Sequence, residues 1–155
     1  MIREFKNLSE EEARSLIDAP VLVSLLIAGA DEEVDEKEKD KSIKIAHFRA
    51  QNPESILKDY YAEVDKYFEQ SFSQYMESLP KDSSSRNHFI SSRLEKLNEI
   101  LPKLDNEFAC EFYKSLVSYA KRVAEASGGV LGYGSVNAAE SEWMDLKMIN
   151  PPVKE

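Results

Sequence analysis

The sequence predicts an all-α fold of about seven helices in two packed sub-bundles, and three observations support this. Apolar residues recur at steps of three and four through most of the chain, which is the period of an amphipathic helix. No stretch alternates apolar and polar residues as a half-buried strand does. The 155 residues, 42% of them apolar, are enough to bury a core, so we expect residues 1–155 to form a single domain.

The fold is organised around an apolar segment at residues 20–30. Its sequence, PVLVSLLIAGA, leaves no polar face, so a helix here must be surrounded by other helices. The segment is about half as long as the roughly 20 apolar residues of a membrane span, and we expect no membrane insertion. Asp18 occupies the position of an N-cap, with Pro20 in the first turn, where a missing N–H costs nothing.

Helices are expected on both sides of this segment. Before it, Ser9 and Glu12 have the spacing of a capping box that begins a first helix. After it, an acidic turn at residues 31–34 reverses the chain. Asp35 and Glu38 then form a second capping box, which begins a charged helix.

Apolar stripes and proline or glycine breaks mark the remaining elements. The clearest loop is PKDSSS at residues 80–85, and we expect at most a minor ribbon near residues 130–136. The helices expected after the acidic turn are 35–51, 54–79, one that carries Ile90 to Leu101 and ends at Pro102, 104–126, and 138–149.

Charge and cysteine content limit the possible partners and the compartment. The net charge is -9, which argues against binding to a nucleic-acid backbone or an anionic membrane and permits cationic partners, either metal ions or basic proteins. The single cysteine, Cys110, excludes an internal disulfide and suits the cytoplasm. The N-terminal sequence has no apolar signal core. We therefore expect a cytoplasmic protein.

Two turns of the chain are similar in sequence. Residues 28–38 and residues 124–140 each join the end of one helix to a capping residue that is followed three positions later by glutamate. Two such units predict an internal duplication with two packed sub-bundles. Two capping boxes also recur by chance, and the sequence leaves both interpretations open.

The segment LLIAGADEEVDEKEKDKSIKI resembles the tellurite-resistance TerB-like family, whose hallmark is an apolar helix ending in Ala-Asp-Gly and a restart bearing Glu. EASGGVLGYGSVNAAESEW is similar to the family's second copy of that turn. The resemblance implies a pseudo-duplicated helical fold, an acidic surface that holds divalent metal, and an interaction role in stress or tellurite resistance. Glu32 and Ser127 depart from the family's glycine and aspartate, which argues against two symmetrical metal sites.

The acidic turn is the strongest candidate for a metal site. Carboxylates at alternating positions of a turn suit a hard cation, and Asp31 and Glu38 would be the first ligands, joined by Glu140 or Glu142. An EF-hand is excluded, because its glycine and final glutamate positions carry Glu36 and Ser42. Alternatively, these acids only cap a helix and meet its dipole. The candidate ligands are Asp31, Glu33, Asp35, Glu38, Glu140 and Glu142, for calcium, magnesium, manganese or zinc.

Other candidate features favour structural roles. The glycines at 129 and 134 have the spacing of a phosphate loop, but Ser135-Val136 stands where Lys-Ser/Thr is needed. This loop is more consistent with a flexible connection or a protein contact. His47 and His88 are expected to be buried or half-buried, and Cys110 is expected to be a small buried hydrophobe.

The aromatic stripe between residues 60 and 75 is expected to form core. Any aromatic side chain that stays exposed there would mark a surface for a partner.

No nucleophile–base pair, zinc motif or phosphate loop is present in the sequence. We therefore expect a non-enzymatic helical domain with a protein partner, and an acidic face that holds a divalent metal ion. The alternative is a protein-interaction module with no metal site, in which the acidic turns are helix caps.

We expect metal-stripped protein to bind calcium, magnesium, manganese or zinc in a calorimetric titration, and Asp31→Asn combined with Glu38→Gln to weaken that binding. Thermal unfolding distinguishes a metal-ligand role of these carboxylates from a helix-cap role. Loss of a cap alone lowers the free energy of unfolding by about 1 kcal/mol, whether or not the ion is present. Absence of both heat and stability gain at roughly millimolar ion would exclude the metal site and favour the interaction module.

Overall fold

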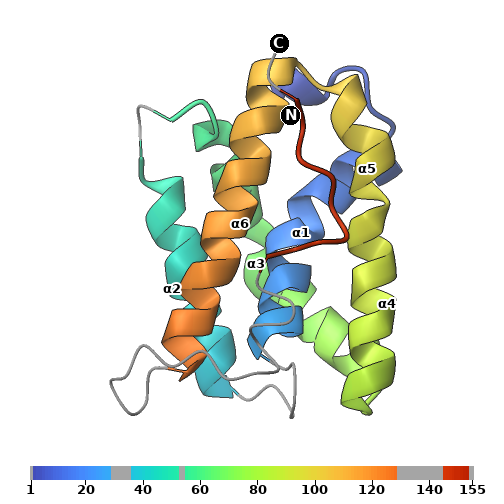
Figure 1. Cartoon of the computed structure of the whole chain (residues 1–155). Helices are drawn as coiled ribbons and strands as arrows, with labels where there is room; N and C mark the ends of the chain where they lie inside the picture. Colours follow the sequence, from blue (N-terminus) through green and yellow to red (C-terminus); the bar gives the residue numbers. More distant parts are fainter. Residues whose placement is uncertain (1, 29–35, 53–54, 129–144, 154–155) are drawn as a thin grey trace.

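The helices of the computed structural model run up and down a single bundle (Figure 1). The structure describes residues 2–28, 36–52, 55–128 and 145–153, and none of these residues is in a strand. The all-α prediction is therefore confirmed. The elements are η1 (Arg3–Phe5), α1 (Glu10–Ala28), α2 (Glu36–Ala50), α3 (Lys58–Ser78), α4 (Ser83–Glu95), α5 (Leu97–Ile100), η2 (Leu101–Lys103) and α6 (Asn106–Gly128).

Helix α1 lies in the middle of this bundle. It contacts α2, α3, α4, α5 and α6, and every residue from Leu22 to Ile27 is buried. The prediction of a central apolar helix is confirmed, and the segment is buried among other helices as its lack of a polar face requires. Within the described ranges, no helix is both long and apolar enough to cross a membrane.

The predicted break before Pro20 is wrong. Proline has no N–H for the carbonyl of Leu16, four residues earlier, yet α1 continues through it. The Tyr60 hydroxyl of α3 donates to the Leu16 carbonyl at 2.6 Å and supplies the missing donor. Asp18 is not an N-cap, because its carboxylate accepts from Arg14 Nε at 3.2 Å and from the Tyr75 hydroxyl at 3.0 Å.

The predicted number of helices is also too high. The described residues form five long helices and the single-turn α5, since the first two expected helices are the one continuous α1. The expected loop at residues 80–85 is shorter than predicted, because the Asp82 carboxylate accepts from Ser85 N at 2.8 Å and begins α4 at Ser83. The last expected helix is not formed at residues 145–149, which make a turn.

Several other elements agree with the sequence prediction. Helix α3 buries its predicted stripe, although it begins at Lys58 instead of residue 54. The Ser9–Glu12 capping box is present, with Glu12 N donating to Ser9 Oγ at 3.1 Å and Ser9 N to Glu12 Oε1 at 3.0 Å. The expected ribbon near residues 130–136 lies outside the described residues.

Buried hydroxyl groups tie the outer helices to α1. The Tyr119 hydroxyl of α6 lies 2.8 Å from Ser24 Oγ of α1 and donates to the Ser42 carbonyl of α2 at 3.3 Å. Ser24 Oγ in turn donates to the Pro20 carbonyl at 2.8 Å. Burial raises the pKa of Tyr60 and of Tyr119 well above the ordinary value, so both side chains are neutral in the folded protein.

Tyr60→Phe should lower the free energy of unfolding by about 1–3 kcal/mol, because it leaves the buried Leu16 carbonyl without this hydrogen bond. In a Pro20→Ala background the new N–H can donate to that carbonyl, and Tyr60→Phe should cost clearly less. Chemical denaturation of the four proteins measures the difference.

The neighbouring Tyr61 is the matched control for this cycle, because its hydroxyl contacts Ser115 of α6 and not α1. Tyr61→Phe should cost the same with proline or alanine at position 20. An equal cost of Tyr60→Phe in both backgrounds would show that the tyrosine does not replace the missing N–H.

The buried tyrosines should also make the fold sensitive to alkali. Burial raises the pKa of Tyr60 and Tyr119 in the folded chain, while the unfolded chain ionises near the ordinary tyrosine pKa of about 10. Their contribution to stability is therefore fully present below pH about 10 and is lost as pH rises toward the folded pKa values. The part of the phenolate absorbance that comes from these two buried tyrosines should rise together with the loss of helical circular dichroism. Complete ionisation with the helices intact would contradict this account.

Candidate functional site

The predicted metal ligands fall on the part of the chain that the structure does not describe. Asp31, Glu33, Asp35, Glu140 and Glu142 lie outside the described residues. The backbone of Glu38 belongs to the first turn of α2, but its side chain is also outside the description. Among the described residues, no group of three or more His, Cys, Asp or Glu side chains could hold a metal ion. The metal site therefore stays a prediction.

The helices that flank the two similar turns end together. In Figure 1, α1 and α6 both end at the lower end of the bundle, where α2 begins. Lys41 Nζ of α2 donates to the Ala126 carbonyl near the end of α6 at 3.0 Å, which suits the negative end of that helix. The end of α1, the start of α2 and the end of α6 thus lie at the same end of the bundle (Figure 1).

The two histidines are not buried as predicted. His47 is exposed, with Nδ1 2.8 Å from Asp65 Oδ2 and Nε2 2.8 Å from Gln51 Nε2. Its contact with Asp65 of α3 joins α2 to α3 at the surface. His88 is exposed on α4, whereas Cys110 is buried as predicted.

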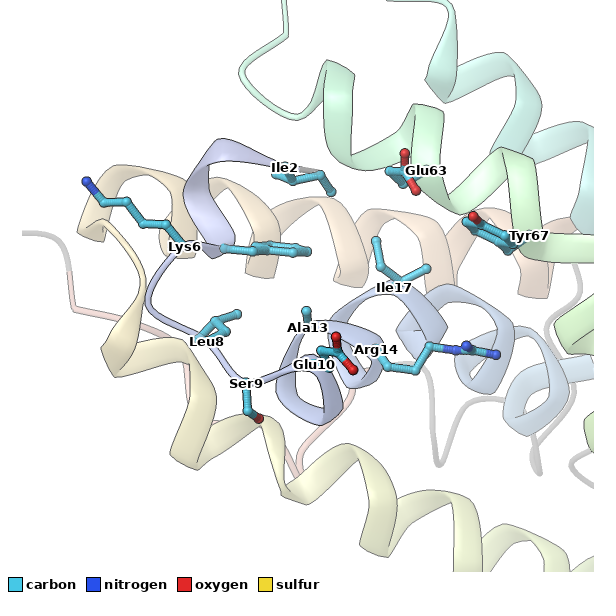
Figure 2. A pocket seen from close by; sticks show the side chains of 11 residues that line it. Ile2, Lys6, Leu8, Ser9, Glu10, Ala13, Arg14, Ile17, Glu63 and Tyr67 are labelled. Carbon is cyan, nitrogen blue, oxygen red and sulfur yellow. The ribbon is translucent and has the colours of Figure 1, made fainter.

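A groove of about 460 Å³ opens on the surface between η1, α1 and α3 (Figure 2). We call it the α1–α3 groove. Its apolar lining comes from all three elements and from two residues just outside them, Ile2 and Leu8, while charged side chains stand around its rim. The residues that line it are Ile2, Phe5, Lys6, Leu8, Ser9, Glu10, Ala13, Arg14, Ile17, Glu63 and Tyr67.

The start of α1 explains why a hollow forms here. In a capping box, the residue before the cap commonly packs on the fourth helical residue as a hydrophobic staple. Here these positions are Leu8 and Ala13, and both are only partly buried. The methyl group of Ala13 is too small to fill the space that a larger staple residue would occupy. This pattern is the sequence signal from which the groove could have been predicted.

Contacts with the rest of the bundle fix the positions of the residues that form the walls of the groove. Phe5 is buried and packs edge-on against Tyr60 and Phe108, with ring centroids 6.4 Å and 6.1 Å apart. Lys103 Nζ donates to Glu12 Oε2 at 2.5 Å and joins the first turn of α1 to η2. This hydrogen bond, together with one from the Ser9 N–H, lowers the pKa of Glu12. The groove is therefore part of a fixed surface.

Tyr67 is the most exposed aromatic side chain between residues 60 and 75, at 40%. It extends from α3 at one end of the groove, on the same wall as Glu63 (Figure 2). Lys66 Nζ lies 5.2 Å from the centre of its ring. The sequence predicted that an exposed aromatic in this stretch would mark a surface for a partner, and Tyr67 meets the condition of that prediction.

Charges of both signs surround the apolar lining. Figure 2 shows Lys6 and Arg14 toward opposite ends of the groove, with Glu63 on the α3 wall and Glu10 on the α1 wall. The Nε atom of Arg14 is engaged by Asp18, but 60% of the Arg14 side chain is exposed. Its guanidinium can therefore still donate to an incoming carboxylate.

Comparison with known proteins does not assign this chain to a family. No protein-family model matches the chain, and neither a curated protein nor a solved structure matches it.

Proposed function

We propose that this protein is a non-enzymatic interaction module whose α1–α3 groove receives the apolar face of an amphipathic helix from a partner protein. The observation that carries the proposal is an open groove with an apolar lining and an exposed tyrosine on one wall. Exposed apolar surface that is continuous and surrounded by polar residues is typical of protein interaction sites.

A helix is the occupant that the walls favour. The groove is formed by side chains of two helices, and a third helix can pack its ridges into such a surface. Recognition of this kind uses apolar anchors at helical spacing. An exposed tyrosine next to an apolar hollow is a common anchor at interfaces, since it combines a large apolar ring with a polar tip.

Charge makes the proposed partner more specific. The chain as a whole carries -9, but the groove rim has two cations, Lys6 and Arg14, and two carboxylates, Glu10 and Glu63. A partner of a single sign would meet repulsion at one pair of these groups. We therefore propose a partner helix with acidic and basic residues on either side of its apolar stripe.

The isolated exposed side chains elsewhere are weaker candidates. Phe48 on α2 is 79% exposed, but it does not line the α1–α3 groove. Single exposed hydrophobic residues are normal on soluble proteins. The metal site proposed from the sequence concerns the other end of α1, and the titration above tests it independently.

A library of helix-forming peptides selected on the full-length protein tests the groove. Selected peptides should bind at least about tenfold more weakly to Ala13→Leu, which fills the groove, and to Tyr67→Ala, which removes an anchor. Fluorescence anisotropy gives the affinities, and thermal unfolding confirms that each variant is folded.

Phe89→Ala is the matched control for this selection. Phe89 on α4 is 41% exposed and has the Arg93 guanidinium 5.9 Å from its ring centre, much as Tyr67 has Lys66. Its removal should leave peptide binding unchanged. Selected peptides that bind Ala13→Leu and Tyr67→Ala as tightly as the unchanged protein would overturn the proposal, as would a selection that yields no binding peptide.

A further inference from the structure

The C-terminal segment, residues 145–153, is held against the bundle as a ligand would be held. We call it the tail. In Figure 1 it runs between α6 and the α4–α5 side of the bundle toward the end where the chain begins. It is not helical, and two of its side chains, Leu146 and Ile149, are buried at 0% and 2% exposure. The tail therefore has two apolar anchors three residues apart.

Side-chain amides of the bundle bind the main chain of the tail. Asn98 Nδ2 donates to the Met148 carbonyl at 2.9 Å, and Asn98 Oδ1 accepts from Asn150 N at 2.7 Å. Asn106 Nδ2 donates to the Val153 carbonyl at 2.9 Å. A side-chain amide that both donates to and accepts from one backbone makes the hydrogen bonds of a neighbouring strand. This recognition depends on the shape of the bound backbone, and its chemistry is the same whether that segment belongs to this chain or to another.

Prolines favour an extended backbone in the last part of the tail, the conformation that this recognition requires. Asn150 and Pro151 each precede a proline, so both favour an extended backbone. Such a segment loses little conformational freedom when it binds. Beside it, a hollow of about 590 Å³ is lined jointly by tail and bundle residues. We call this hollow the tail groove. On the side of the tail it is lined by residues 150–153, and its bundle residues are Asn98, Leu101, Pro102, Leu104, Asn106 and Ala109.

The first anchor has an unfavourable backbone conformation. Leu146 has a φ of 50°, the left-handed region that a residue with a Cβ normally avoids. Such a residue persists only where its surroundings impose it, and strained positions of this kind concentrate at ligand contacts and switch segments. The bound tail is thus held by contacts that oppose a local backbone preference, and release of the tail would relieve that strain.

We propose that the surface of the bundle under the tail, which includes the tail groove, is a binding site for a peptide that turns between two apolar anchors three residues apart and continues extended through Pro-Pro, and that the tail is its built-in occupant. A peptide with this pattern in trans competes with the tail. The attached tail has the advantage of a high effective concentration, so the site is largely closed to such peptides until the tail is weakened.

The test uses the full-length chain and a fluorescent peptide of residues 145–153. Leu146→Asp combined with Ile149→Asp removes both anchors from the attached tail and leaves the groove residues unchanged. The peptide should bind this variant at least about tenfold more tightly than the unchanged protein. Asn98→Ala added to the variant should weaken peptide binding about tenfold or more, because both amide hydrogen bonds are lost.

Two controls make the result specific. A peptide that carries the same two aspartates should not bind, and Ala13→Leu, which fills the α1–α3 groove, should leave binding of the unchanged peptide as it was. The second control separates this inference from the proposed function. If the double variant does not fold, Ile149→Ala in the full chain replaces it. A folded variant that does not bind roughly millimolar peptide, or that binds it no better than the unchanged protein does, would overturn the proposal.

Discussion

The hydrogen bond from the Tyr60 hydroxyl to the Leu16 carbonyl is the contact on which the architecture depends. A proline inside a buried helix removes one donor and leaves a carbonyl that water cannot reach. Tyr60 supplies that donor from α3 at 2.6 Å, and Ser24 satisfies the carbonyl of Pro20 itself at 2.8 Å. The Tyr60 bond replaces the donor that Pro20 lacks, and α1 is one continuous helix from Glu10 to Ala28. A continuous α1 is long enough to contact every other long helix of the described bundle.

The position of α1 determines where the two proposed binding surfaces lie. Its first half, which begins with the Ser9–Glu12 capping box, forms one wall of the α1–α3 groove. Its second half is buried and is joined to α6 through Ser24 and Tyr119. The first turns of α6 in turn hold the tail through Asn106. The same helices thus present both proposed surfaces, and a preformed surface loses less free energy to ordering when a ligand binds.

Local patterns in the sequence predicted the features that depend on neighbouring residues. The capping box at Ser9, the buried stripe of α3 and the burial of Cys110 were all predicted and are observed. The continuity of α1 was not predicted, because its partner, Tyr60, lies 44 residues from Leu16. The hydrogen bonds that hold the tail were not predicted for the same reason, since Asn98 and Asn150 lie 52 residues apart. The contact of His47 with Asp65 also joins two different helices.

The α1–α3 groove, the surface proposed to bind a partner, follows from a local rule. Leu8 and Ala13 occupy the two positions of a hydrophobic staple, but alanine cannot fill the space between the turn and the helix. Evolution toward stability alone would favour a larger residue here, because filling a hollow with apolar atoms is one of the common stabilising changes. The hollow is also surrounded by charges of both signs and bordered by an exposed tyrosine. A defect in packing would need neither feature, whereas a surface that binds another chain uses both.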